Sequence, residues 1–339
     1  PHVTTNWISQ LRQIPKREIV HNITVYYPQL FYLPKKISKM SLGIFLFFRL
    51  LPIVRQLHKS HRFQIIHAFG EFPEGFAAYA LSALFRLPII ITHRRTFTSN
   101  KLKESYFLKK INSYIISNIN RNITSSDALS NQSSNFSVVA PGIDLLKYQS
   151  VDRLEIRKKL CLSTQKQILI FRGTLLPESG INYLIDAFEL LAKKNKNLVL
   201  YIIGRGILKD ALIRKVSNLK LDKCVTIKDD VDDRAVPLWL NAGDLFILPG
   251  INAEFPVNAI KALACGTPVI ACKSEMTSEI VPDSKIGLLA NQRDCQDLAM
   301  KIKMGLARRW NRKLLVKRAQ KYNIDDTVQR IQDIYDNCT

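Results

Sequence analysis

The chain has 339 residues, of which 47% are apolar, and a formal net charge of +22. This length allows two domains of ordinary size, and this apolar fraction excludes wholesale disorder. The positive charge is typical of proteins that contact a polyanion such as acidic lipid, nucleic acid or a phosphorylated substrate, and a codon bias toward lysine is the alternative origin.

The cysteines and the apolar segments indicate the compartment. The six cysteines form no CxxC pair and have no histidine partners at zinc spacing, which fits reduced thiols better than a disulfide framework. The chain opens with a helix-like pattern and shows no signal peptide. Its longest apolar stretch, residues 42–54, is interrupted by Arg49 and Pro52 and is too short to cross a bilayer. We therefore expect a cytoplasmic protein.

Helices and strands alternate along the whole chain. In the first half we expect helices at 1–13, 41–59, 75–85 and 103–119, and strands at 23–27, 64–68, 88–92, 122–125 and 138–140. In the second half we expect strands at 168–171, 198–204, 225–227, 246–248 and 268–271, and helices at 181–194 and 326–338. Because strands that alternate with helices form parallel sheets, the sequence predicts an α/β protein with two doubly wound, Rossmann-like domains. We place these domains at residues 1–148 and 149–339 and expect them to face each other across a cleft.

Residues 247–270 carry the strongest functional signal in the chain. A buried strand ends at Pro249, a loop with a single acid follows, and a helix then leads to the next strand at 268–271. In an open α/β sheet, ligands bind outside the carboxyl ends of the strands, and a helix N-terminus at that place favours anions. The stretch therefore predicts an anion-binding βαβ unit.

This stretch, which ends in ALACGTPV, resembles the signature of the retaining GT-B glycosyltransferases of family 4. In that family a loop Glu and a helix Glu lie eight positions apart just before such a segment. Other segments are similar to the family's and follow in its order: IIHAFGEFPEGFAAYAL, ITHRR, VVAPGIDLLKY, IFRGTLLPESGINYLIDAFELL, YIIGRGILKDAL and VPLWLNAGDLFILPG. The resemblance covers most of the chain from Ile65 onward. It implies the GT-B fold and transfer of a sugar from a nucleoside diphosphate to a glycan or lipid-linked acceptor, with retention and without a metal or other cofactor.

The resemblance also implies the residues of the site. The catalytic candidates are His93, which ends a strand, and Glu254, one place after the position of the family's loop Glu. Glu71 and Glu74, in a loop after a strand, are acceptor-side candidates. Residue type alone favours a strand-end His93 bonded to backbone, and the resemblance makes the two interpretations of His93 equal; for the two glutamates the favoured alternative is a solvated turn. The candidates for binding the nucleotide sugar are Arg172, Gly173, Thr174, Ser179, Gly204, Arg205, Gly206, Phe255, Pro256, Val257, Asn258 and Lys261.

Several positions depart from the family where a diphosphate needs cations. The family's loop Arg and Lys correspond to Thr174 and Ser179, and its helix Glu, which holds the ribose hydroxyls, corresponds to Lys261. An ammonium cannot accept hydrogen bonds. The family's first strand and its Gly-Gly loop have no counterpart, so we expect a first domain without that strand. Two interpretations follow: a working transferase in which Arg172 and Lys261 supply charge, or a catalytically inactive GT-B protein that binds a partner at a membrane or polyanion.

Two basic segments of the first half suggest a surface for anionic lipid. Residues 33–62 carry seven Lys and Arg around an apolar, phenylalanine-rich face, and residues 101–110 repeat the pattern with four Lys. Basic helices with exposed aromatic residues are typical of interfacial membrane elements. The alternative is an amphipathic helix that packs on the sheet and keeps its basic side in water. No helix-turn-helix, zinc finger or RNP pattern occurs, so we expect no specific nucleic-acid partner.

Overall fold

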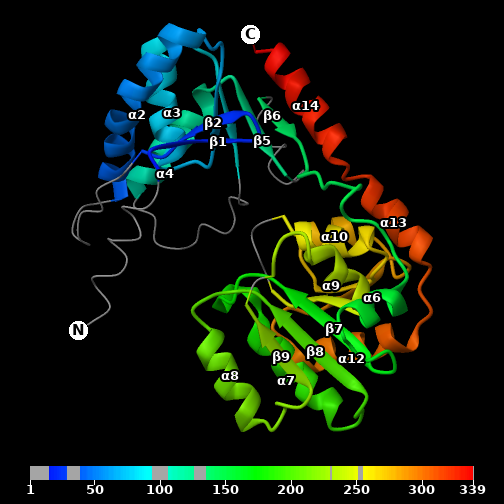
Figure 1. The fold of residues 1–339 in the computed structure, drawn as a ribbon. Coiled ribbons are helices and arrows are strands. Elements are labelled where there is room, and N and C mark those ends of the chain that lie inside the picture. The colour runs from blue at the N-terminus through cyan, green and yellow to red at the C-terminus, as the bar shows by residue number, and fades with distance from the viewer. Residues whose placement is uncertain are drawn as a thin grey trace. The chain divides into compact units, whose positions relative to one another are not determined.

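The computed structural model describes residues 15–28, 39–93, 106–125, 135–229, 231–250 and 255–338 (Figure 1). The chain forms two compact units, residues 1–138 with 333–339 and residues 139–332. The helix expected at 1–13 lies outside the described residues. The expectation that the two halves face each other across a cleft stays a prediction.

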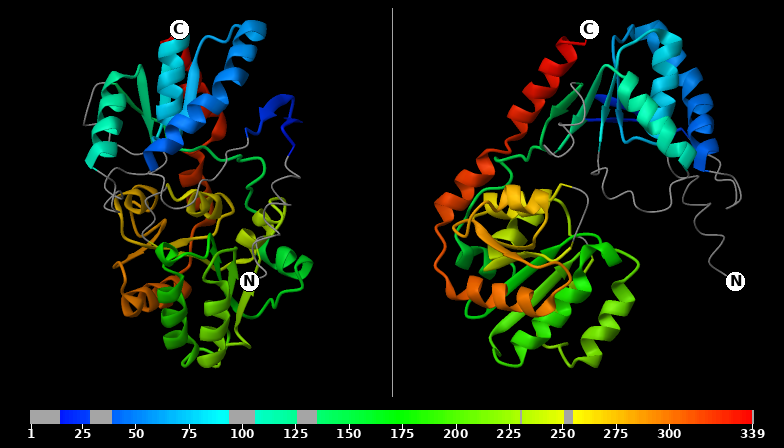
Figure 2. Two further views of the ribbon diagram at one scale, coloured as in Figure 1. Left: turned by 90° about the vertical axis from the view of Figure 1, so that its left-hand side faces the viewer. Right: turned by 180° about the vertical axis from the view of Figure 1, so that it is seen from behind.

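The first unit is built on a four-stranded parallel sheet of order β3-β4-β5-β6. The strands are β3 (Ile66–Phe69), β4 (Ile89–Thr92), β5 (Arg121–Thr124) and β6 (Phe136–Val138), and the helices are α2 (Lys39–His61), α3 (Glu74–Phe85) and α4 (Tyr106–Asn118). Figures 1 and 2 show these three helices grouped together beside the sheet. The small core joins β3, β4, α3 and the end of α4 through Ala68, Ala78, Ile89, Ile91, Ile115 and Ile119.

One part of the first unit is antiparallel, which corrects the expectation of purely parallel strands there. Strand β2 (Ile23–Tyr26) pairs with β1 (Arg17–Val20) in a separate two-stranded ribbon. The two residues between them, His21 and Asn22, have φ of 48° and 66°. Positive φ at both central residues is the mark of the tight hairpin turn whose twist matches antiparallel strands. The strand at 23–27 was therefore predicted correctly, but its partner was not.

Helix α2 is longer than the sequence suggested, because it continues through Arg49 and Pro52. Its stretch Ser41–His61 is long and apolar enough to cross a membrane by length and composition, with a mean hydropathy of 1.2. The expectation that no apolar segment reaches this length was therefore wrong. Gly43 lets α2 approach α3, since a Cβ there would lie 2.8 Å from the ring of Phe76.

The second unit contains a six-stranded parallel sheet of order β12-β11-β10-β7-β8-β9. The strands are β7 (Gln167–Arg172), β8 (Leu198–Ile203), β9 (Val225–Lys228), β10 (Leu245–Leu248), β11 (Val269–Cys272) and β12 (Gly287–Ala290). Taken in chain order this is 3-2-1-4-5-6, the doubly wound arrangement, which confirms the predicted fold class. The strand order reverses between β7 and β10.

The helices cover both faces of this sheet because the strands are apolar on both sides. Ile168 and Ile170 of β7 point into one core, and Leu169 and Phe171 point into the other. The first face is covered by α9 (Val236–Ala242) and α10 (Val257–Ala264), and the second by α7 (Ile181–Ala192), α8 (Lys209–Asn218) and α12 (Cys295–Ala307) (Figure 1). The remaining helices are α6 (Arg153–Lys159), α11 (Glu275–Ile280), α13 (Arg312–Gln320) and α14 (Ile324–Asp336).

Candidate functional site

Loops at the carboxyl edge of the second sheet approach one another so closely that only glycine fits between them. A Cβ on Gly204 would lie 1.9 Å from the carbonyl oxygen of Gly173, and a Cβ on Gly180 would lie 2.2 Å from that of Pro249. Gly180 and Gly204 also have φ of +69° and +155°, which side chains disfavour. The loops after β7, β8 and β10 are therefore brought together at the point where the strand order reverses, the place where open α/β sheets bind ligands.

Backbone hydrogen bonds fix two of these loops against each other. The Leu175 amide donates to the carbonyl of Arg205 at 2.8 Å, and the Leu208 amide donates to the carbonyl of Leu175 at 3.1 Å. A Cβ on Gly206 would lie 2.3 Å from the same Leu175 oxygen. The predicted Gly204-Arg205-Gly206 segment thus supports the loop after β7, and the Arg205 side chain is exposed.

Arg172 and Asn258 connect the end of β7 with the first turn of α10. The Arg172 Nη1 donates to the Asn258 Oδ1, and the Asn258 Nδ2 donates back to the Arg172 carbonyl, both at 3.2 Å. Helix α10 starts at Val257 with no side-chain cap at Pro256. These bonds place a guanidinium beside the beginning of α10, where an anion is also favoured by the helix.

Two predicted positions differ from each other in exposure. Thr174 is exposed, whereas Ser179 is buried and its hydroxyl donates to the Leu176 carbonyl at 2.7 Å. Ser179 therefore serves the loop itself.

Three cations gather around Tyr148 at this edge of the sheet. The Lys261 Nζ lies 4.9 Å from the centre of the Tyr148 ring, and the Lys147 Nζ lies 5.7 Å from it. Burial, and after it the charge of Arg172, lowers the pKa of Lys261, with a smaller effect of Lys147 in the same direction. Asp233, which pairs with Lys147, opposes these effects. We call the group of Lys147, Arg172 and Lys261 the cation cluster; among the described residues, the Asp233 carboxylate pairs with one of its members.

Tyr148 itself is buried beneath the cation cluster. Only 4% of its surface is exposed, and burial raises its pKa to about 12. Its buried hydroxyl has no hydrogen-bond partner among the residues that the structure describes. A buried hydroxyl in this state lowers the stability of the fold.

The remaining predicted residues near α10 divide into two groups. Phe255 is buried in the core and its ring lies 5.8 Å from that of Tyr322. The Val257 amide donates to the Phe255 carbonyl at 2.9 Å, so this amide already has a partner within the chain. Glu254 lies outside the described residues. The expectation that Glu254, Lys261, Thr174, Ser179 and His93 converge stays a prediction.

The carboxyl edge of the first sheet holds a separate polar cluster. His93 follows β4 and is 2% exposed, with Nδ1 at 3.0 Å from the Glu71 Oε1 and Nε2 at 2.7 Å from the Asn122 Oδ1. The ring stacks on Phe136 with centroids 5.7 Å apart. His93 is thus bonded to side chains, which differs from the backbone-bonded alternative. Glu74 is exposed at the start of α3.

His67 joins β3 to the C-terminal segment within the same unit. Its Nδ1 lies 2.6 Å from the Tyr335 hydroxyl and its Nε2 lies 2.7 Å from the Thr92 hydroxyl. Burial lowers the pKa of His67, which favours the neutral ring. This histidine therefore links β3 to Thr92 of β4 and to Tyr335 of α14 within the first unit.

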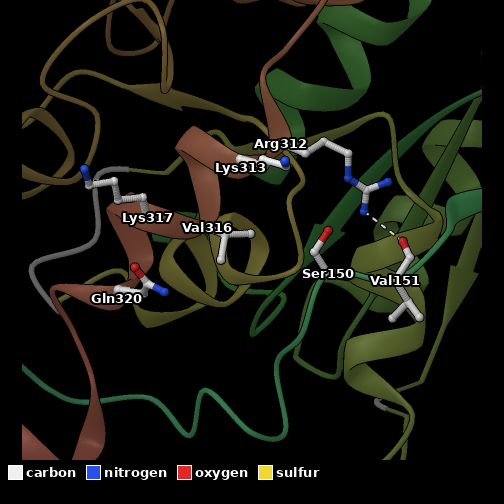
Figure 3. A pocket seen from close by; sticks show the side chains of 7 residues that line it. All are labelled: Ser150, Val151, Arg312, Lys313, Val316, Lys317 and Gln320. Atoms are coloured by element: carbon white, nitrogen blue, oxygen red, sulfur yellow. Dashed lines mark hydrogen bonds between the residues drawn. The ribbon is translucent and has the colours of Figure 1, made fainter.

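A groove of about 530 Å³ lies beside α13, away from the predicted residues (Figure 3). Figure 3 shows the Arg312 side chain reaching toward Val151, to whose carbonyl it donates at 3.0 Å. Arg312 also donates to the Cys265 carbonyl at 3.0 Å. These bonds give Arg312 a role in holding α13 to the fold. Among the described residues, no three His, Cys, Asp or Glu side chains gather as a metal site would require.

The sequence analysis missed four residues of these two clusters. Lys147, Tyr148 and Asp233 surround Lys261, and Asn122 orients His93. The first two belong to the VVAPGIDLLKY segment, in which no residue was named as a site candidate. The only signal in the sequence for Asn122 is a polar residue at the start of an apolar strand.

Known proteins are similar to this chain in sequence and in fold. The profile of a family described as glycosyl transferases group 1 matches residues 152–322. A D-inositol 3-phosphate glycosyltransferase from Rhodococcus jostii (strain RHA1) is 34% identical over 170 residues, 48% of this chain and 37% of that protein. Another from Arthrobacter sp. (strain FB24) is 25% identical over 287 residues, 78% of this chain and 68% of that protein. The chain thus spans little more than a third of the first relative.

Solved structures share the fold. Sucrose-phosphate synthase from Thermosynechococcus elongatus has a TM-score of 0.83 at 20% identity, over 96% of this chain and 86% of that chain. Anabaena HepE in complex with UDP has a TM-score of 0.74 at 19% identity, over 85% of this chain and 82% of that chain.

Proposed function

Because the chain belongs to the glycosyl transferases group 1, we propose that it transfers a sugar from a nucleoside diphosphate sugar to a glycan or lipid-linked acceptor, with retention of configuration. The observation that carries this proposal is the meeting of three loops and the start of α10 beside the cation cluster. A diphosphate is the ligand that such an edge favours, because helix-end amides and cations both stabilise its charge.

The cation cluster replaces the charges that the loop after β7 lacks. Thr174 is uncharged and Ser179 is buried, so neither supplies a cation to a phosphate. Arg172 ends β7 and Lys261 lies on α10, and the Lys261 ammonium is destabilised first by burial and then by the charge of the neighbouring Arg172. A bound diphosphate relieves this repulsion. In this proposal the protein cations neutralise the diphosphate charge in place of a metal ion, so we expect glycosyl transfer to continue in the presence of a chelator.

The first donors and acceptors to test follow from the relatives. HepE binds UDP and glucose, and the curated relatives act on D-inositol 3-phosphate. We therefore propose a panel that begins with uridine diphosphate sugars, and acceptors that include D-inositol 3-phosphate and lipid-linked glycans. Mass spectrometry of the products should reveal an acceptor heavier by one sugar residue. If no acceptor in the panel gains a sugar residue and no nucleotide is released, the proposal that the protein is a transferase is wrong.

The second candidate is a catalytically inactive protein of the same fold that binds a partner or polyanion. It is favoured by the loss of charge at Thr174 and by the lysine at position 261. Calorimetric titration separates the two candidates. A transferase binds UDP in the cation cluster, whereas an inactive protein with a lost site binds neither UDP nor a uridine diphosphate sugar.

We further propose that the first unit binds the anionic inner face of the cytoplasmic membrane through α2. Ile44, Phe45 and Phe48 are 42%, 44% and 62% exposed, and the exposed Arg55 and Lys59 follow on the same helix. Each cation near anionic lipid adds about 1 kcal/mol, and the aromatic rings enter the interface.

Sedimentation with vesicles tests the membrane proposal. Vesicles containing phosphatidylglycerol should retain the protein, and vesicles of phosphatidylcholine alone should not. Phe48→Ser should weaken retention, whereas the control Ile213→Ser, an exposed apolar residue on α8, should leave it unchanged. Equal retention of both variants and wild type would exclude α2 as the contact.

A further inference from the structure

In the first unit, the hydrogen bonds that His93 forms with Asn122 and Glu71 determine which of its ring nitrogens carry protons. The Asn122 Nδ2 donates to the carbonyl of Ile116 at 2.9 Å. A carbonyl only accepts, so this bond sets the orientation of the amide and turns the Asn122 Oδ1 toward the His93 Nε2. The Nε2 must therefore carry a proton. Asn122 is completely buried, which leaves its amide no competing water.

The other ring nitrogen of His93 also faces an acceptor. Its Nδ1 lies 3.0 Å from the Glu71 Oε1. If the ring were neutral with its proton on Nε2, the Nδ1 lone pair would oppose a carboxylate oxygen. The pair avoids this repulsion when a second proton lies between Nδ1 and Oε1. His93 and Glu71 thus form a charge-assisted pair, and Asn122 is the residue that forces it.

Burial distinguishes the two partners. The His93 side chain has no exposed surface, whereas 16% of the Glu71 side chain is exposed. His93 therefore has no surface at which to contact a sugar directly, and it is stacked on Phe136. Glu71 keeps part of its side chain accessible at the carboxyl edge of the parallel sheet. Its backbone is held by the Phe76 amide, which donates to the Glu71 carbonyl at 3.2 Å.

We propose that Glu71 binds a hydroxyl of the sugar acceptor, and that His93 and Asn122 are positioning residues that orient the Glu71 carboxylate and maintain its charge. This inference rests on the proposed function. It assigns to His93 an effect through Glu71, in place of a direct contact with the nucleotide sugar. Of the two acceptor-side candidates it selects Glu71, because Glu71 has a buried partner that fixes its carboxylate.

The first test needs no enzymatic activity. Protein with ¹⁵N-labelled histidine is examined by long-range ¹H–¹⁵N NMR at neutral pH, and His93→Gln identifies the His93 signals. The wild type should show two protonated ring nitrogens at His93. In Glu71→Gln the amide of the new residue can donate to Nδ1, so His93 should become neutral with its single proton on Nε2. A neutral His93 in the wild type would overturn the inference.

The second test uses steady-state kinetics with the substrate pair that the panel identifies. Glu71→Gln should raise the acceptor KM by roughly tenfold or more, the effect of losing a hydrogen bond to a charged group, and leave the KM for the nucleotide sugar unchanged. His93→Gln should raise the same KM less, and the double variant should match Glu71→Gln alone, because the two residues act as one unit. The control Glu18→Gln makes the same chemical change on the β1–β2 ribbon and should have no effect.

The outcomes separate this inference from the proposed function. If His93→Gln raises the KM for the nucleotide sugar and spares the acceptor KM, His93 contacts the nucleotide sugar and the inference is wrong. If additive effects appear in the double variant, His93 does not act through Glu71. If NMR shows the doubly protonated ring but no substrate pair is converted, the proposed function fails and the acceptor role of Glu71 fails with it, while the ion pair stands.

Discussion

Replacing Lys261 by methionine should weaken the binding of UDP without disturbing the fold. The Lys261 ammonium lies over the Tyr148 ring, and burial, followed by the charges of Arg172 and Lys147, disfavours its charged form. An anion in the cation cluster therefore gains from Lys261 and removes a repulsion at the same time. Methionine keeps most of the length of the side chain and its apolar contact with the ring, so the variant removes mainly the charge.

The size of the effect follows from one charged hydrogen bond. Such a bond contributes about 1.5–3 kcal/mol, which corresponds to roughly 10- to 150-fold in the dissociation constant. Because Arg172 remains, and Lys147 is already paired with Asp233, we expect Lys261→Met to lie within this range. Lys261→Glu should weaken binding at least as much, since its carboxylate would neutralise Arg172.

Calorimetric titration with both UDP and pyrophosphate decides where the Lys261 charge acts. If the Lys261 ammonium contacts the phosphates, Lys261→Met should raise the dissociation constants of UDP and pyrophosphate by the same factor, and added salt should reduce the difference between the variant and wild type. The control Lys193→Met removes an exposed charge that pairs with Glu189 on the second unit and should change neither affinity. Tighter binding of UDP by Lys261→Glu would place position 261 at the ribose and refute the argument. Adding Thr174→Arg to Lys261→Glu should then improve it further, because position 174 is exposed.

Three further predictions concern stability and thiol reactivity. Tyr148→Phe should raise the free energy of unfolding by about 1 kcal/mol, since it removes a buried hydroxyl without a described partner. Tyr322→Phe should lower the free energy of unfolding, because the Tyr322 hydroxyl donates to Glu279 at 3.0 Å. Urea denaturation of both variants measures these changes, and a lower free energy of unfolding in Tyr148→Phe would contradict the prediction. Gly204→Ala should cost more than about 3 kcal/mol or prevent folding, because its Cβ would lie 1.9 Å from a backbone oxygen; a midpoint of urea denaturation equal to that of wild type would exclude the close approach. Burial raises the pKa of Cys265 from 9.0 to about 12, so on raising the pH the unfolded thiol loses its proton before the folded one, and the contribution of Cys265 to stability should fall between these pH values. The difference in unfolding free energy between wild type and Cys265→Ala, followed over this pH range, measures the fall. At pH 8 a thiol reagent should label the exposed Cys161 before the buried Cys265, and simultaneous labelling of both would contradict the burial.

Much of the fold could be predicted because the apolar patterns are long and the connections regular. The strands of the second unit are uniformly apolar, which indicates a parallel sheet covered on both faces, and their order along the chain is the doubly wound one. The β1–β2 ribbon was missed because its turn depends on positive φ at His21 and Asn22, and neither residue is the glycine that announces such a turn.

The sequence marked the loops of the candidate site but not the side-chain partners of its residues, and the binding of a nucleotide sugar there stays a prediction. Gly204 and Gly206 were named from the sequence, and both lie where the backbone of another loop leaves no room for a Cβ; close backbone approach requires glycine and so leaves a trace in sequence. The partners of Lys261 could not be found in this way. Lys147 and Asp233 are far apart in sequence, and nothing local marks a lysine as paired or a tyrosine as buried. The role of Asn122 could not be predicted from the sequence either, because its amide is oriented by the carbonyl of Ile116, a contact that only the fold creates.

The measurement that tests the central claim most directly is ¹H NMR of the reaction in progress with a uridine diphosphate α-sugar and its acceptor. The anomeric signal of the nucleotide sugar should decrease while an α-linked product signal rises at the same rate, with and without a chelator. Conversion to a β-linked product would contradict retention. An unchanged nucleotide sugar at all times and with every acceptor of the panel would contradict glycosyl transfer itself and leave the fold as a binding protein.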